Sequence, residues 1–164
     1  MNDCKYGYSM KDRVMTQTLI KSGTEPNLTA DQEEHFFTYS LYPHAGTWRE
    51  AGTEQEALNL NVPAKAVAGA AEKDRMEFLS VDKRDVVLET VKKAEDGDGV
   101  IVRLYEVENA RTKVTLHCAE AIASAEETDL LENPIEGALG VKENEIELTI
   151  KPYEIRTIRI RTAK

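Results

Sequence analysis

The 164-residue sequence has few cysteines and histidines and no long apolar run. It has two cysteines, Cys4 and Cys118, and three histidines. Two cysteines so far apart show no pairing pattern, and they favour free thiols in a reducing, cytoplasmic setting. No apolar run reaches the roughly 18 residues of a membrane-spanning helix. The first residues also lack the apolar core of a signal peptide, so we expect neither a membrane anchor nor secretion.

Positive charge is scarce as well. Thirty acidic residues stand against 21 Lys and Arg, and the net charge of −9 divides into −3 for residues 1–84 and −6 for residues 85–164. Phosphate backbones and anionic membrane surfaces are bound by clustered Lys and Arg, and neither part of the chain has such a cluster. We therefore expect no nucleic-acid partner and no membrane partner, and we interpret the acidity as a source of solubility.

A distinctive local pattern covers residues 35–50. Residues 35–42 place aromatic side chains on both sides of an extended segment, which is typical of a strand covered on both faces. Pro43 would end this strand because it cannot donate to a ladder. The sequence Thr-Trp-Arg-Glu at 47–50 fits a capping box, so a helix is predicted over residues 48–60.

The carboxyl-terminal part has the alternation of hairpin-connected strands. Short strands are predicted at residues 76–81, 86–93, 100–105, 113–118, 122–128 and 146–150, with a strong turn signal at 95–99. In the last strand Tyr153 and Ile155 are out of phase with Ile158 and Ile160. This phase change predicts a bulge near Arg156 and Thr157.

The pattern as a whole predicts an all-β fold. We expect a small antiparallel β-sandwich at residues 81–164. Residues 1–80 are expected to hold a few strands, including one over 12–20, and the helix near 48–60, as the end of a larger β-sandwich domain. The segment 64–71 suits helix and strand equally by propensity.

Carboxylate pairs give no convincing catalytic centre. Glycoside hydrolysis uses two carboxylates about 5–10 Å apart across the sugar. The pairs Glu126 and Glu127, or Glu145 and Glu147, are candidates by proximity, but solvated surface charge is the stronger interpretation of each. No catalytic residue is predicted.

Metal ligands are not predicted either. His35 and His44 are separated by an extended segment of up to roughly 30 Å, which is too far for them to share an ion. His117 and Cys118 are adjacent on a strand and should face opposite sides, giving a surface histidine and a core cysteine.

Five segments of the sequence, taken in order, resemble the C-terminal β region of glycoside hydrolase family 38, the α-mannosidases. They are Asn2-Asp3-Cys4-Lys5-Tyr6-Gly7-Tyr8, residues 35–50, Asp85–Lys93 with Glu95-Asp96-Gly97, Arg103-Leu104-Tyr105-Glu106, and Lys151-Pro152-Tyr153-Glu154-Ile155-Arg156-Thr157. The resemblance favours extended structure for 64–71. It also implies that the chain is the tail of a much longer enzyme.

The resemblance carries functional expectations. Family 38 enzymes are zinc-dependent retaining α-mannosidases whose nucleophile and zinc ligands lie in an N-terminal catalytic domain, so this chain would scaffold that domain and hold no zinc itself. Asp3, Lys5 and Tyr6 are candidates for the rim of the substrate site, although the stronger interpretation is that they finish a turn and a sheet edge. The expected partner is the parent's own catalytic domain. Exposed edges and apolar faces make a homo-oligomer the other expected association.

A second class of function remains open at this point. An independent carbohydrate-binding β-sandwich would use aromatic side chains as stacking surfaces, and Tyr6, Tyr8, Trp48 and Tyr105 are available. Trp48 could stack on a sugar, but a tryptophan on a helix face is more often part of a core.

Overall fold

The computed structural model describes residues 6–70, 72–137 and 139–163. Its contacts divide the chain into two compact units, Met1–Gly69 and Ala70–Lys164. The division near residue 80 stays a prediction about the domains of a longer protein.

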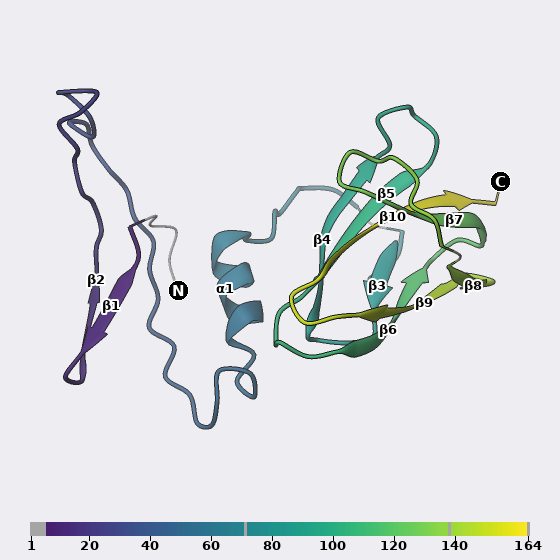
Figure 1. The fold of residues 1–164 in the computed structure, drawn as a ribbon, viewed down its shortest axis with the longest axis horizontal. Helices are drawn as coiled ribbons and strands as arrows, with labels where there is room; N and C mark the ends of the chain where they lie inside the picture. Colours follow the sequence, from purple (N-terminus) through teal and green to yellow (C-terminus); the bar gives the residue numbers. More distant parts are fainter. Residues whose placement is uncertain (1–5, 71, 138, 164) are drawn as a thin grey trace. The chain divides into compact units, whose positions relative to one another are not determined.

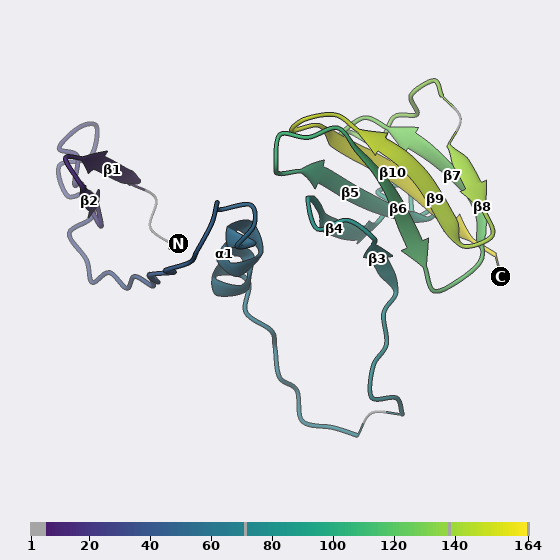
Figure 2. The same ribbon diagram turned by 90° about the horizontal axis from the view of Figure 1, so that it is seen from below.

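The second unit consists of two four-stranded antiparallel sheets (Figures 1 and 2). The first sheet has the order β4 (Val86–Lys93), β5 (Val100–Glu106), β10 (Ile155–Thr162) and β7 (Ile122–Thr128). The second has the order β3 (Leu79–Val81), β6 (Thr112–Cys118), β9 (Glu145–Ile150) and β8 (Gly140–Lys142). The predicted all-β class and sandwich are confirmed.

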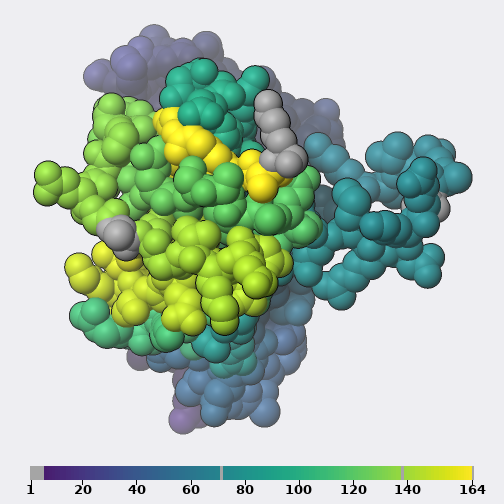
Figure 3. All heavy atoms as spheres, turned by 90° about the vertical axis from the view of Figure 1, so that its right-hand side faces the viewer, coloured from purple at the N-terminus to yellow at the C-terminus, as the bar shows by residue number. Residues whose placement is uncertain are grey.

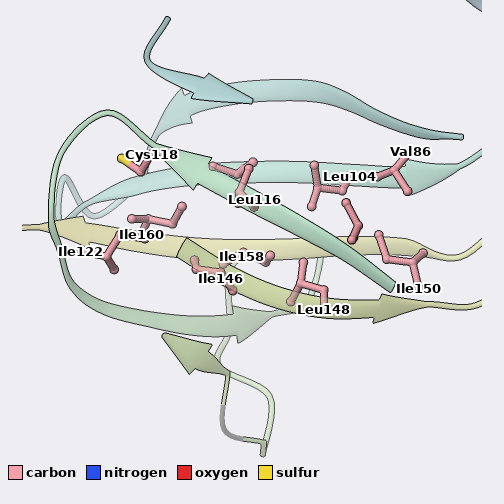
Figure 4. Close-up of a cluster of buried hydrophobic side chains, with 12 residues drawn as sticks. Val86, Leu104, Leu116, Cys118, Ile122, Ile146, Leu148, Ile150, Ile158 and Ile160 are labelled. Carbon is pink, nitrogen blue, oxygen red and sulfur yellow. The ribbon is translucent and has the colours of Figure 1, made fainter. Parts of the chain in front are cut away.

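The core lies between these sheets and comes mostly from even-numbered positions (Figure 4). Strands β5, β6, β9 and β10 contribute Val102, Leu104, Val114, Leu116, Cys118, Ile146, Leu148, Ile150, Ile158 and Ile160. Successive side chains of a strand point to opposite faces, so this single phase builds one apolar layer. Burying each large aliphatic side chain stabilises the fold by about 1.5–3 kcal/mol.

Strand β10 corrects one prediction. It pairs with β5 without interruption from Ile155 to Ile160, so the bulge predicted near residues 156–157 is wrong. The register shift lies instead between Arg161 and Thr162, against β7. Tyr153 sits in the preceding turn with a φ of 55°, and Ile155 is 59% exposed. Neither Tyr153 nor Ile155 points into the core. The bulge was predicted because both were counted as core residues, which put them out of phase with Ile158 and Ile160.

Other local features of the sandwich follow the sequence pattern. The predicted turn at 95–99 is present, with Gly97 and Gly99 at positive φ. A Cβ on Gly99 would lie 2.6 Å from the carbonyl oxygen of Ile160, so the turn requires glycine there. Strand β3 is shorter than the predicted 76–81. Strand β8 was not predicted, because its three residues are all exposed and show no apolar alternation.

The first unit begins with a hairpin of β1 (Tyr8–Lys11) and β2 (Val14–Gln17). The two residues between these strands, Asp12 and Arg13, both have positive φ, 49° and 65°, as a type I′ turn requires. The strand predicted over residues 12–20 is therefore wrong at both ends. Residues 12 and 13 form the turn, and the strand runs only from Val14 to Gln17.

Residues 35–42 form no strand, contrary to the prediction. Tyr39 makes a single β-bridge, and no strand in the described part of the chain extends it into a ladder. Phe36 is 84% exposed and Leu41 77% exposed. Residues 64–70 are likewise without strand structure, and residue 71 lies outside the described residues. Among the described residues, neither segment has a neighbouring strand that would complete a ladder.

The helix of the first unit is α1 (Thr53–Asn61). The predicted capping box is present, since Thr47 N donates to Glu50 Oε2 (2.7 Å) and Glu50 N donates to Thr47 Oγ1 (3.3 Å). These two bonds close a turn at residues 47–50, however, and the helix does not start there. Gly52 adopts the left-handed region with a φ of 64° and becomes the N-cap, so the helix begins five residues later than predicted. No helix formed by the described residues has the length and hydropathy of a membrane span.

Candidate functional site

Of the three predicted rim residues, the structure describes one. Asp3 and Lys5 lie outside the described residues. The Tyr6 side chain is 43% exposed, and its hydroxyl donates to Asp31 Oδ2 at 3.1 Å. This bond ties the residue that precedes the β1–β2 hairpin to the turn at residues 28–31. A role for Tyr6 at a substrate rim stays a prediction.

The proposed stacking residues are distributed over both units. Tyr6, Tyr8 and Trp48 belong to Met1–Gly69, whereas Tyr105 lies in β5 of the sandwich. Trp48 is half-buried, and the guanidinium carbon of Arg49 lies 4.5 Å from the centroid of its ring. This cation–π contact already covers one face of the indole, which reduces its value as a platform for a sugar.

The first unit lacks an apolar core of its own. None of the described hydrophobic residues between 6 and 69 is buried, whereas the sandwich buries a continuous cluster. The most exposed large side chains of the unit are Met10, Leu28, Phe36, Leu41, Val62 and Val67. We call these six side chains the exposed apolar set.

A second candidate site is a depression of about 450 Å³ on the sandwich. It lies where β7 ends and β10 begins, and we call it the β7–β10 depression. Its lining consists of Glu127, Thr128, Asp129, Leu130, Leu131, Ile135, Ile155 and Thr157. Figure 3 shows how closely the last strand, in yellow, packs between segments that are distant in sequence.

Each member of the two candidate carboxylate pairs has a basic side chain as partner. Glu127 binds Arg156 through both carboxylate oxygens, and Glu126 lies 3.0 Å from Arg161 Nη1. Glu147 is an exposed partner of Lys113, 2.6 Å away, and the hydrogen bond from that ammonium lowers its pKa. None of these pairs is arranged as an acid and a nucleophile facing a cleft.

Buried charges were not visible in the sequence. Arg159 of β10 is buried and forms an ion pair with Asp96 of the 95–99 turn at 2.5 Å. Glu132 is also buried, and it accepts from Lys92 Nζ and from the backbone N–H of Glu95, both at 2.8 Å. The hydrogen bond from Lys92 is the largest cause of a lowered Glu132 pKa. These contacts hold the 95–99 turn and the loop after β7 against the outer face of the first sheet.

Glu106, at the end of β5, is the most buried carboxylate, with 1% exposure. It accepts from the backbone N–H groups of Glu108 (2.7 Å), Ala110 (3.0 Å) and Tyr153 (2.9 Å). Burial raises the pKa of Glu106, but the backbone donors together outweigh that effect and lower it. Glu106 is therefore a structural carboxylate that joins the β5–β6 turn to the turn before β10.

The described residues contain no group of three or more His, Cys, Asp or Glu side chains that could hold a metal ion. Cys118 is a free, buried thiol, and His117 lies on the other side of β6, 3.3 Å from Glu145. The predicted core cysteine and surface histidine are confirmed. Cys4 lies outside the described residues. No residue described here is assigned to hold the zinc that the resemblance places in another domain.

Residues 85–158 match the family model described as the glycosyl hydrolases family 38 C-terminal beta sandwich domain. The chain is 36% identical to alpha-mannosidase 2C1 of Mus musculus and 35% identical to that of Homo sapiens, in each case over 96% of this chain. It is 34% identical to alpha-mannosidase G of Dictyostelium discoideum over 97% of this chain. It spans only 16% of the length of the mouse and human relatives. Residues 85–158 thus form a C-terminal β-sandwich domain of the family 38 glycosyl hydrolases.

Proposed function

We propose that the chain is a non-catalytic C-terminal β part of a family 38 α-mannosidase, an enzyme that hydrolyses terminal α-mannosides. In this role it scaffolds the enzyme's catalytic domain. The observation that carries the proposal is the pattern of similarity, which covers 96% of this chain but 16% of relatives named as α-mannosidases. The chemistry of the candidate carboxylate pairs agrees, because Glu126, Glu127, Glu145 and Glu147 each have a basic side chain as partner.

The exposed apolar set supports the catalytic domain as the partner. Side chains such as Phe36 and Leu41 are almost fully exposed in the chain by itself. Their burial against another polypeptide would contribute about 25 cal/mol for each Å² of apolar surface removed from water. A second copy of the chain is the competing partner, and it would appear as a homo-oligomer.

The zinc of the proposed enzyme belongs to the catalytic domain and supplies chemistry only there. For the chain in hand, a reducing, cytoplasmic compartment is part of the proposal. The buried free thiol of Cys118 supports it.

Hydrolysis of a chromogenic aryl α-mannoside, with zinc supplied, tests the proposal. The chain alone is expected to release no chromophore above the buffer rate, because the proposal places the nucleophile and the zinc ligands in the catalytic domain. Co-expressed with the remainder of the enzyme, it should co-purify with an active complex.

Zinc-dependent turnover by the 164 residues alone would refute a non-catalytic role. Calorimetry with mannose oligomers is the matching control for the carbohydrate-binding alternative. The absence of a heat of binding agrees with a scaffold, whereas a saturable heat of binding by the isolated chain would favour the carbohydrate-binding alternative.

A further inference from the structure

The outer face of the first sheet carries a fully buried aliphatic side chain, that of Ile101. The next residue of β5, Val102, belongs to the core, so Ile101 points to the opposite side of the sheet. Ile101 is nevertheless 0% exposed. In the register of the sheet it lies between Lys92 of β4 and Arg159 of β10. A buried aliphatic side chain on this face requires a cover that the second sheet cannot provide.

Arg159 joins two loops that are distant in the sequence and lie beside Ile101. Its Nη1 is 2.5 Å from Asp96 Oδ2 in the 95–99 turn. Its Nη2 donates to the backbone carbonyl oxygen of Glu132, in the loop after β7, at 3.4 Å. One buried guanidinium therefore holds both loops above β10.

Glu132 makes the same connection from the other direction. Its carboxylate lies 2.8 Å from Lys92 Nζ and accepts from the backbone N–H of Glu95, also at 2.8 Å. The residue has a φ of 69°, a left-handed conformation that glycine adopts readily and other residues rarely adopt. A glutamate in this conformation, with its carboxylate buried and bonded to the opposite loop, indicates that the connection is what the position serves.

These contacts are separate from the core of the sandwich. Neither the core cluster nor the side chains packed against it include any residue of 94–99 or 129–135. Segments with few buried apolar contacts open locally at a lower free energy than core strands. The two loops can therefore leave the outer face without opening the space between the sheets.

We propose that the 95–99 turn and the loop after β7 form one clasp over Ile101, which opens and closes as a unit while the core stays folded. Glu132 and Arg159 are its two locks. Residues 129–131 of the same loop line the β7–β10 depression, so the clasp couples the wall of that depression to the 95–99 turn. The clasp belongs to the sandwich itself and does not depend on the proposed function.

Hydrogen exchange of the 164-residue chain, followed by NMR at single amides, tests the clasp. The informative amides are those of Gly97 and Asp98 in the turn and of Leu131 and Asn133 in the loop. Each bonds within its own loop and not to Glu132, so a purely local effect of that side chain would not reach the turn. In the wild type these four amides should share one protection factor, well below that of β5 and β10.

Glu132→Gln keeps the size of the side chain and removes the charge that faces Lys92. It should speed exchange about tenfold in both loops, including the two amides of the turn, because hydrogen bonds to charged groups are stronger than neutral ones by about that factor. Glu95→Gln is the matched control. Glu95 pairs with the same ammonium, but its side chain is 80% exposed and both partners of the pair lie at the β4 end of the clasp. This variant should leave the two amides of the loop after β7 unchanged.

Asp96→Asn tests the coupling from the opposite end. It weakens the ion pair with Arg159 and should speed exchange at Leu131 and Asn133 a few-fold, a smaller effect because the Asp96 side chain is 54% exposed. Three results would each overturn the clasp. They are changes confined to the mutated loop, an equal effect of Glu95→Gln on both loops, and protection of the four amides equal to that of β5.

Discussion

Truncation of Ile158 to alanine is expected to lower the free energy of unfolding of the sandwich by about 3 kcal/mol, while Phe36→Ala changes it by less than about 0.5 kcal/mol. Ile158 is 0% exposed and lies in β10, which pairs with β5 on one side and β7 on the other. Its truncation removes buried apolar surface and leaves a cavity that the paired strands cannot close. Phe36 is 84% exposed and has little burial to lose.

Urea unfolding followed by far-UV circular dichroism measures both variants. Trp48 is the only tryptophan and belongs to Met1–Gly69, so its fluorescence is not a report on the sandwich. Ile158→Val, which removes one methylene, provides the graded control and should cost about 1 kcal/mol. A cost for Phe36→Ala similar to that for Ile158→Ala would mean that the first unit has a core of its own, contrary to this account.

Replacement of Glu106 by alanine is expected to destabilise the sandwich by about 3 kcal/mol, because buried backbone donors would be left without acceptors. The donors come from both the β5–β6 turn and the turn before β10. Loss of the carboxylate therefore releases two loops together. Glu147→Gln removes an exposed charge from the ion pair with Lys113 and should have almost no effect.

The pH dependence of the Glu106 contribution has a definite sign. Its pKa in the folded state is lowered, since the backbone donors outweigh the effect of burial. A lowered pKa means that the stabilisation is fully present above the unfolded value, near 4.3, and is lost as the pH falls through the folded value. The stability difference between wild type and Glu106→Gln should therefore shrink in acid. A difference that is constant from neutral pH to well below pH 4 would contradict the assignment.

The sandwich could be predicted from sequence because its pattern is self-contained. Val114, Leu116 and Cys118 alternate with polar residues, and the partners they pack against lie within the same unit. The segment 35–42 has an equally strong pattern, but the prediction of a covered strand was wrong for this chain. Phe36 and Tyr39 are 84% and 61% exposed, and no strand among the described residues covers the segment. A pattern shows that a side chain is suited to burial, not which polypeptide covers it.

The polar sites could not be predicted for a different reason. In a sequence with thirty acidic residues, Glu106 and Glu132 look like ordinary surface charges. Glu106 is enclosed by two turns that are distant in sequence, and Glu132 by contacts with Lys92 and with the backbone of Glu95. No local periodicity encodes either arrangement.

Hydrogen exchange tests the central claim most directly, that Met1–Gly69 is completed by the rest of an α-mannosidase. Amide exchange would be compared between the chain alone and the chain co-expressed with the remainder of the enzyme. We predict slow exchange in β5 and β10 in both samples, and fast exchange across residues 6–69 that becomes slow only in the complex. Residues 6–69 that are as protected as β5 in the isolated chain, or that stay unprotected in an active complex, would contradict the account.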